Sequence, residues 1–367
     1  MAATRSFLVH RKDFSQTKYQ TTDALPEPGP GQILMKVERF SYTANNISYA
    51  ATGDVLRYWE FFPAEEGFGI TPVWGFAEVT ASQCEGVEVG ERFYGYYPMG
   101  SHLLAEPGNI KPTGFIDQAA HRQPLSVIYN QYVNCSKDPL YQADTEEMQM
   151  LLRPLFTTSF LLDDFFDDNQ FFGASNLILT SASSKTAAGM AYALHRNRSK
   201  RDHDYKIIGL TSASNKVFVE KLGCYDEVIT YDQIEQLDAT QPSAIVDFAG
   251  NGDVLKRLHA QLAPQLQYSC LVGASHWDQR GKTKKDLDGP HPIMFFAPTQ
   301  AEKRLNEWGG SVFQQRLADL WLAFTAFAQG WIEVENISDP KAVANIYQTV
   351  LAGDQSPSAG YILSLSQ

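Results

Sequence analysis

The stretch from Ser175 to Lys216 constrains the fold more than any other part of the chain. It begins with an apolar run at 176–180, which has the length of a buried parallel strand, and small residues follow at 181–186. The segment 187–198 is rich in alanine, methionine and leucine and ends in basic residues, which is typical of a helix. A second apolar strand is expected at 206–210. Strand, tight turn, helix and strand make the first half of a dinucleotide-binding unit.

The turn of this unit departs from the usual G-x-G-x-x-G motif, whose glycines allow a tight bend and close approach of the backbone to a pyrophosphate. Here the turn reads Ser-Ala-Ser-Ser-Lys-Thr, and the next glycine is Gly189. Small side chains keep that approach open, and Lys185 adds a positive charge beside the helix start, where the backbone dipole also favours anions. The turn therefore supplies four candidate cofactor-binding residues: Ser183, Ser184, Lys185 and Thr186.

Two other interpretations of the turn stay open. The triplet 184–186 resembles the end of a phosphate-binding loop, although Leu179 and Ser184 stand where such a loop needs glycine. The turn is also compatible with an α/β domain that binds no ligand at this place.

The strand and helix pattern continues beyond this unit. A helix and a strand are expected within 217–231, and further strands at 243–251 and 267–275. Long helices are expected at 148–166 and 312–329. Apolar strands that alternate with helices predict an α/β fold with a doubly wound parallel sheet.

The N-terminal third of the chain has a different pattern. Short strands are expected at 6–9, 32–40, 71–80 and 91–97, and the segment 25–31, rich in proline and glycine, must be a turn. Strands at this spacing predict a small barrel-like β domain.

Three segments of this β domain carry a family resemblance: Pro-Glu-Pro-Gly-Pro-Gly-Gln-Ile-Leu-Met-Lys-Val at 26–37, the run 41–53, and Val-Glu-Val-Gly-Glu-Arg-Phe-Tyr-Gly at 87–95. In their order they resemble the medium-chain dehydrogenase/reductase superfamily. The nearest likeness is to its zinc-free quinone and enone reductases, and to a branch of unknown function that has this altered turn in place of the glycine motif.

The resemblance implies a fold and a division into domains. A Rossmann dinucleotide-binding domain is expected at 126–329, and a GroES-like β-barrel catalytic domain at 1–125 and 330–367, with the substrate in the cleft. Gly250 and Gly273 match the family's glycines after the fourth and fifth strands of the nucleotide domain. Relatives are often dimers, so a homodimer is compatible with the resemblance.

The resemblance also bears on zinc. Zinc-dependent relatives carry a cysteine after the second strand and a Gly-His-Glu soon afterwards. Here 42–46 occupies the first place, and no His-Glu pair precedes Val73. Without ligands that polarise an alcohol oxygen, we expect hydride delivery, independent of zinc, to a substrate already activated by conjugation.

The second strand of the nucleotide unit bears on the choice of cofactor. An Asp or Glu at its end would bind the ribose 2′-hydroxyl of NADH, whereas a 2′-phosphate needs cations and hydroxyls. No acid follows the strand at 207–210; Ser212, Asn215 and Lys216 suit a phosphate, and Tyr231 matches a family position close to it. The sequence predicts NADPH, with a solvated helix start as the alternative role for Lys216.

In zinc-free relatives an Asn and a Tyr near the end of the second strand face the nicotinamide. The matching segment 43–49 offers Tyr49 as the first candidate for proton donation, with Asn45 and Asn46 next. Ile47 replaces the family's Asp, and core packing is the alternative role for Tyr49. The aromatic residues around 58–62 are expected to line a pocket or the core.

Two groups of charges have no assigned chemistry. The acids at 163–168 are expected at a solvated helix end, with a carboxylate metal site as the alternative. Lys303 and Arg304 could neutralise the charge of an acidic substrate or of the cofactor phosphate; the alternative is that both side chains face solvent.

Composition limits the partners and the compartment. The net charge of −12 argues against nucleic acids and anionic membranes. Four widely spaced cysteines, and the lack of an apolar run typical of a signal peptide or a membrane span, indicate a cytoplasmic protein. The sequence thus predicts NADPH-dependent reduction of an enone, quinone or related small conjugated carbonyl. A non-catalytic NADPH-binding redox sensor is the alternative, and an acyl-processing accessory enzyme is a third, by analogy alone.

Overall fold

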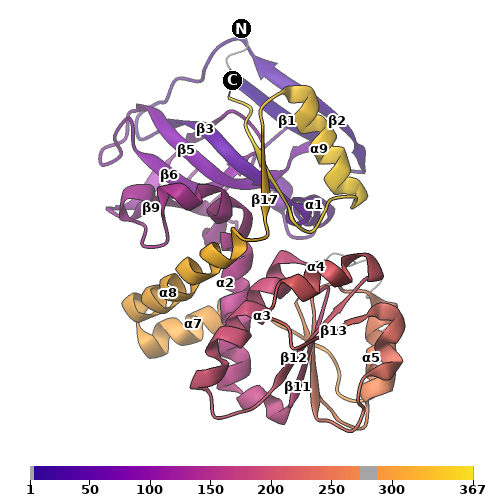
Figure 1. Ribbon diagram of the computed structural model, residues 1–367. Coiled ribbons are helices and arrows are strands. Elements are labelled where there is room, and N and C mark those ends of the chain that lie inside the picture. Colours follow the sequence, from indigo (N-terminus) through magenta and orange to yellow (C-terminus); the bar gives the residue numbers. More distant parts are fainter. Residues whose placement is uncertain (1–3, 273–286, 367) are drawn as a thin grey trace. The chain divides into compact units, whose positions relative to one another are not determined.

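The computed structural model describes residues 4–272 and 287–366, so Gly273, one of the candidate cofactor residues, lies outside the described residues. The chain forms two compact units, one made of 1–151 with 332–367 and the other of 152–331 (Figure 1). The assignment of a catalytic and a nucleotide-binding domain with limits at 125/126 and 329/330 stays a prediction.

The first unit is built on antiparallel strands. A three-stranded sheet has the order β2-β1-β4, and a larger mixed sheet has the order β17-β18-β3-β5-β6-β10-β9-β8, with β7 paired to β3. Their bounds are β1 Thr4–His10, β2 Asp13–Thr22, β3 Ile33–Tyr42, β4 Phe68–Ile70, β5 Pro72–Ser82, β6 Arg92–Pro98, β7 His102–Ala105, β8 Pro107–Lys111, β9 Gly114–Asp117, β10 Gln131–Asn134, β17 Glu333–Ile337 and β18 Ala359–Leu363.

Strand β3 gives the larger sheet its barrel-like form. It pairs with β5 along its length, while its residues 33–36 pair with β7 and its residues 40–42 pair with β18. A strand with three partners curls the sheet, and the inner face is filled by a core that includes Val37, Phe40 and Tyr97. Two helices belong to this unit, α1 Ala44–Ala51 and α9 Pro340–Ala352.

The second unit contains a parallel sheet with the order β13-β12-β11-β14-β15-β16. In chain order these are strands 3-2-1-4-5-6, so the direction of winding reverses between β11 and β14. The predicted doubly wound parallel sheet is confirmed. The bounds are β11 Asn176–Thr180, β12 Lys206–Thr211, β13 Glu227–Thr230, β14 Ser243–Asp247, β15 Leu266–Leu271 and β16 Ile293–Met294.

Helices cover both faces of this sheet, and α3 and α5 lie on opposite sides of it (Figure 1). Leu177 and Leu179 of β11 join the core formed with α3, while Ile178 joins the core formed with α5, as alternation along a strand requires. Helix α2 Glu146–Asp168 begins in the first unit and continues into the second. The other helices described in the second unit are α3 Lys185–Asn197, α4 Lys216–Lys221, α5 Gly252–Leu262, α7 Ala297–Trp308 and α8 Gly310–Ala328.

Close packing of α2 on α3 depends on Gly189. A Cβ atom at this position would lie 2.7 Å from Ser159 Oγ and 3.3 Å from Phe156 Cδ2.

The two units also contain short 3₁₀ turns. They are η1 Tyr58–Glu60, η2 Val127–Asn130, η3 Cys135–Lys137, η4 Ala143–Thr145, η5 Gln170–Gly173, η6 Arg198–Lys200, η7 Ala213–Asn215 and η8 Tyr231–Gln236.

Candidate functional site

The loops that follow β11, β12 and β13 meet at the carboxyl edge of the parallel sheet. Asn215 Nδ2 donates to Ser183 Oγ at 3.1 Å, which joins the loop after β12 to the loop after β11. The Ser181 N–H donates to Tyr231 Oη, also at 3.1 Å, and so brings in the loop after β13. The structure therefore brings together candidate cofactor residues from three separate loops, at the edge where α/β proteins bind ligands.

The first loop makes its tight turn without glycine. Ser181 has φ of 50°, a left-handed conformation that costs a residue with a Cβ roughly 1–2 kcal/mol. The Ser184 N–H closes the turn on the Ser181 carbonyl at 2.7 Å, and Ser184 Oγ then caps α3 by accepting from the Ala187 N–H. The turn thus delivers the start of α3 to the edge of the sheet.

Lys185 is the first residue of α3 and is half-buried. Burial lowers the pKa of its ammonium group to about 8. Thr186 also contributes to packing, because its carbonyl accepts from Ser159 Oγ of α2 at 2.8 Å. A cation and the N-terminal end of a helix therefore coincide at the place where the sequence predicts a pyrophosphate site.

The loop after β12 carries hydroxyls and a cation. The hydroxyls of Ser212 and Ser214 lie 2.9 Å apart. Lys216 Nζ is 3.9 Å from Glu220 one helical turn later, a long and partly exposed ion pair that leaves the ammonium group open to an additional anion.

The loop after β14 is held by Asp247, which the sequence analysis did not single out. This buried carboxylate accepts from Thr180 Oγ1 at 2.6 Å and from the N–H groups of Ala249 and Gly250 at 3.1–3.2 Å. Gly250 has φ of 68°, which explains the glycine at this position. An acid that ends an apolar strand and precedes a glycine is the signal that could have identified Asp247.

In the first unit, the segment predicted to hold the catalytic residues forms the start of α1. Thr43 caps the helix, and the Thr43 N–H donates to Asn46 Oδ1 at 2.7 Å. Asn46 Nδ2 donates to the Pro72 carbonyl at 2.9 Å. Both polar atoms of the Asn46 side chain therefore hold the fold.

Asn45 and Tyr49 lie one turn apart on α1 and contact each other. Asn45 Nδ2 donates to Tyr49 Oη at 2.8 Å, and Trp74 Nε1 donates to the same oxygen at 3.2 Å. Burial raises the pKa of Tyr49, and the hydrogen bonds from Trp74 and Asn45 oppose that rise. Two of the three predicted catalytic residues thus share one hydrogen-bond network, which also includes a tryptophan that sequence reasoning missed.

Aromatic rings surround Tyr49. We call this group the aromatic cluster; its ring centroids lie 4.6 Å apart for Tyr49 and Tyr58, 5.5 Å for Tyr49 and Tyr96, and 5.0 Å for Trp74 and Tyr96. Tyr129 closes the cluster, with its hydroxyl 3.0 Å from that of Tyr58. The Tyr96 hydroxyl is fully buried and has no hydrogen-bond partner among the described residues.

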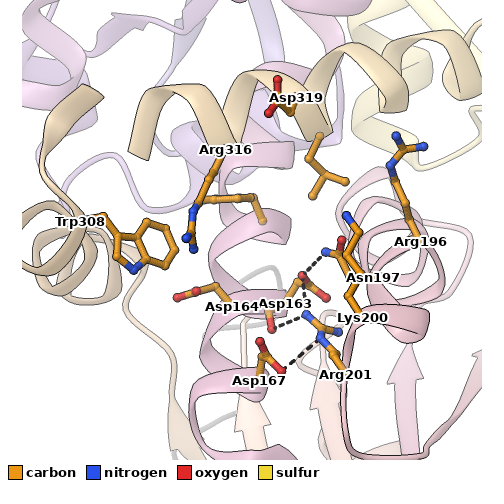
Figure 2. Close-up of a pocket in the computed structure, with 12 residues that line it drawn as sticks. Asp163, Asp164, Asp167, Arg196, Asn197, Lys200, Arg201, Trp308, Arg316 and Asp319 are labelled. Atoms are coloured by element: carbon orange, nitrogen blue, oxygen red, sulfur yellow. Dashed lines mark hydrogen bonds and ion pairs between the residues drawn. The ribbon is translucent and has the colours of Figure 1, made fainter. Parts of the chain in front are cut away.

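A charged cavity of about 370 Å³ opens in the second unit between α2, the end of α3, and α7–α8 (Figure 2). Its position at the C-terminal end of α3, one helix length from the turn at 181–186, separates it from the predicted cofactor residues. The lining residues are Phe160, Asp163, Asp164, Asp167, Arg196, Asn197, Lys200, Arg201, Trp308, Arg316, Asp319 and Leu320.

The prediction of a solvated acidic helix end at 163–168 is wrong for Asp163, which is buried, whereas Asp167 and Asp168 at the end of α2 are exposed. Asp163 is only 4% exposed and accepts from Asn197 Nδ2 and an Arg201 NH group, both at 2.8 Å, while Arg201 also pairs with Asp167 (Figure 2). Burial raises the pKa of Asp163 to about 6. These acids join α2 to the segment after α3.

Lys303 and Arg304 of α7 neutralise the same acidic segment. Arg304 Nε donates to Asp164 at 2.6 Å, and Lys303 pairs with Asp168. Both cations therefore act in packing α7 on α2. In residues 4–272 and 287–366, no group of three or more His, Cys, Asp or Glu side chains is arranged to hold a metal ion. No helix among those residues has the length and apolar character to cross a membrane.

Comparison with known proteins identifies a family and a fold. Residues 40–356 match the family described as "Protein of unknown function (DUF2855)". No curated protein matches the sequence.

Solved structures resemble the chain over almost its whole length. CurA from Vibrio vulnificus in complex with NADPH has a TM-score of 0.57 at 14% identity, with 99% of each chain covered. The yhdH oxidoreductase from Salmonella enterica in complex with NADP has a TM-score of 0.53 at 12% identity, with 98% of this chain and 99% of the other covered. A mutant form of enoyl thioester reductase from Candida tropicalis has a TM-score of 0.53 at 11% identity, with 99% and 100% covered.

At such low identity these likenesses establish the fold. The chain has a Rossmann-type doubly wound parallel sheet and a GroES-like β-barrel, the fold that it shares with these structures. The predicted fold class is confirmed.

Proposed function

The chain belongs to the DUF2855 family of proteins of unknown function, and we propose that it is a zinc-independent, NADPH-dependent oxidoreductase that reduces an enone, a quinone or a related conjugated carbonyl. The observation that carries the proposal is the meeting of three polar loops at the carboxyl edge of the 3-2-1-4-5-6 sheet, through the Asn215–Ser183 and Ser181–Tyr231 hydrogen bonds. Structural neighbours with this fold were solved with NADPH and NADP.

The residues at this edge fit a dinucleotide with a 2′-phosphate. Lys185 and the start of α3 suit the pyrophosphate, since both present positive charge to it. Ser212 and Lys216 suit the 2′-phosphate, and the loop after β12 has no carboxylate to repel it. The remaining proposed cofactor residues are Ser183, Ser184, Thr186, Asn215, Tyr231, Gly250 and Gly273.

NADPH supplies a hydride when it is bound. The other requirement of conjugate reduction is a proton donor for the substrate oxygen that becomes negative as the hydride arrives. Tyr49 is the donor in this proposal, because its hydroxyl oxygen already accepts two hydrogen bonds and its hydrogen is left to donate. Asn45 and Asn46 hold α1, and with it Tyr49, in place.

Zinc independence rests on the residue types at the positions where zinc-dependent relatives carry their ligands. Tyr42–Asn46 lies there, and no cysteine or histidine occurs in it. Such a site offers no soft ligand set for zinc, so the substrate must already be activated by conjugation.

Assembly and compartment are part of the proposal. Among the strands that the structure describes, β16 is at the edge of the parallel sheet; it exposes Ile293 and Met294, and Phe296 beside it is 65% exposed, which supports a homodimer through this edge. All four cysteines are free thiols, which supports a cytoplasmic protein.

A second function is favoured by one observation. Ile47 of α1 stands where the resemblance places an Asp in the route of the proton. A protein that binds NADPH but lacks a complete proton route would not turn over, and a redox sensor is such a protein.

The experiment that tests the function is NADPH oxidation with a panel of enones, quinones and enoyl thioesters, for wild type and Tyr49→Phe. We expect turnover by the wild type and a loss of about 100-fold or more in kcat for Tyr49→Phe, the scale of general acid catalysis. Trp308→Phe is the matched aromatic control, because Trp308 lies at the charged cavity of the second unit, and it should retain wild-type kcat. Tight NADPH binding with no turnover on the whole panel would favour the sensor.

A further inference from the structure

We propose that Trp74 is a positioning residue that, together with Asn45, aims the hydroxyl hydrogen of Tyr49 at the substrate oxygen. The inference rests on the proposed function, because it concerns the direction and the strength of the proton donor. It assigns a role to a residue of β5 that no family pattern in the sequence pointed to.

Tyr49 Oη is the acceptor in both of its hydrogen bonds, with Trp74 and with Asn45. An indole N–H can only donate, so the 3.2 Å contact from Trp74 Nε1 makes the Tyr49 oxygen an acceptor. Asn45 Nδ2 donates to the same oxygen at 2.8 Å. A phenol oxygen has two acceptor sites and one hydrogen, so these two contacts occupy its accepting capacity.

Because both acceptor sites of the Tyr49 oxygen are occupied, the direction of its hydrogen is restricted. The hydroxyl hydrogen of Tyr49 points toward neither Trp74 nor Asn45, and it is left to donate in a third direction. A hydroxyl whose rotation is limited in this way is prepared as a donor before any substrate binds, and such preorganisation is what favours a transition state.

The indole of Trp74 is held in place by aromatic neighbours. Its indole is stacked on Tyr94 of β6, with centroids 5.6 Å apart and planes at 18°, and it contacts Tyr96 at 5.0 Å. β5 and β6 are paired so that Trp74 faces Tyr96 across the ladder. The indole N–H is therefore fixed by the barrel sheet and not by a flexible loop.

The reaction needs one hydride, from NADPH, and one proton, from Tyr49. NADPH, when bound, would supply the hydride for the far carbon of the conjugated system, and the substrate oxygen would then gain the electron pair of its C=O π bond. The O–H bond of Tyr49 then breaks and an O–H bond forms on the substrate, which leaves a phenolate. Trp74 and Asn45 both donate to that phenolate, and water returns the proton afterwards.

The N–H groups of Trp74 and Asn45 strengthen this acid because they favour its charged product. Burial disfavours a phenolate and raises the pKa of Tyr49, whereas both donors act in the opposite direction. Hydrogen bonds to a charged group are about twice as strong as neutral ones, so their effect is greatest once the proton has left.

The test is Trp74→Phe, which keeps an aromatic ring and removes the N–H. We expect kcat to fall about tenfold, the effect of one hydrogen bond to a charged group, with KM and the NADPH dissociation constant unchanged within twofold. We also expect a larger solvent deuterium isotope effect on kcat, because proton donation becomes slower. Trp308→Phe should change neither kcat nor the isotope effect.

Asn45→Asp is a second variant, which tests the same role if Trp74→Phe is unstable. A carboxylate at this half-buried position accepts the Tyr49 hydrogen instead of donating to its oxygen, so kcat should fall more than in Trp74→Phe while the protein stays folded. An active wild type whose Trp74→Phe variant keeps its kcat and isotope effect would overturn this inference alone. A wild type that binds NADPH and reduces nothing would overturn the proposed enzyme and the inference with it.

Discussion

The N–H of Ser181 donates to the hydroxyl oxygen of Tyr231 across 3.1 Å, from the turn after β11 to the residue that follows β13. Because the oxygen accepts this bond, the hydroxyl hydrogen of Tyr231 is left to donate to another group. The contact gives Tyr231 two functions in the proposed site: it holds a turn that has no glycine, and it presents a donor to a phosphate.

Tyr231→Phe should therefore lower the affinity for both nucleotides, because the turn at Ser181 loses its contact, and it should lower the affinity for NADPH about tenfold more than that for NADH, the loss of one hydrogen bond to a charged group. Fluorescence titration with both nucleotides measures this. Tyr225→Phe is the matched control, because the Tyr225 hydroxyl donates to the Ala182 carbonyl of the same turn and so has no hydrogen left for a phosphate. Equal losses for NADPH and NADH in Tyr231→Phe would contradict the account.

Lys185 gives the cofactor site a dependence on pH. Burial lowers its pKa to about 8, so the ammonium charge is present below this pH and is lost as the pH rises through it. NADPH should bind more tightly at pH 7 than at pH 9, and Lys185→Met should weaken binding at pH 7 and abolish most of the difference. Lys221→Met, at an exposed lysine of α4, should behave as wild type. A pH dependence that survives in Lys185→Met would argue against a role for this ammonium group.

The contact of α2 with α3 sets a packing prediction. Gly189→Ala places a methyl group 2.7 Å from Ser159 Oγ and should destabilise the protein by about 1–3 kcal/mol, as overpacking does. Gly310→Ala is the control, since no atom lies within 4 Å of a Cβ there, and it should be neutral or slightly stabilising. Thermal unfolding measures the stability of both variants. Equal stability of Gly189→Ala and Gly310→Ala would contradict the close packing of α2 on α3.

Much of the fold could be predicted because its signals are local. The apolar runs at β11, β12 and β14 identify buried strands, and their alternation with helices identifies the sheet. The loops proposed to hold the cofactor could be located for the same reason, since each follows directly on such a run.

What the sequence could not show depends on contacts between distant segments. The acids of α2 look solvated until Arg201 and Arg304, which follow 38 and 140 residues after their partners, pack against them. Trp74 contacts Tyr49 from a strand 25 residues later. Such pairs have no periodic pattern, so only the folded chain identifies them.

The buried Asp163 provides a stability prediction. Its folded pKa, about 6, is above the ordinary value, so the folded protein holds this proton more tightly than the unfolded chain. The resulting stabilisation is present below about pH 4 and is lost as the pH rises through about 6. Wild type should lose more stability than Asp163→Asn between pH 5 and 7 in thermal unfolding.

Asp167→Asn is the control for Asp163, because Asp167 pairs with the same Arg201 but its side chain is 51% exposed. This variant should keep most of the wild-type pH dependence, because burial is the main cause of the raised pKa of Asp163 and the charge of Asp167 is a smaller one. If Asp163→Asn also keeps it, the carboxyl of Asp163 is not the group that titrates.

If the carboxyl edge of the parallel sheet holds NADPH, a titration of NADPH and NADH into wild type and Lys216→Ala will show it. We expect tight NADPH binding, weaker NADH binding, and a loss of about tenfold in NADPH affinity in Lys216→Ala, with the NADH affinity unchanged. Lys221→Ala should match wild type. Failure of both nucleotides to bind at millimolar concentration would contradict the account, because the three loops would then have no cofactor to hold.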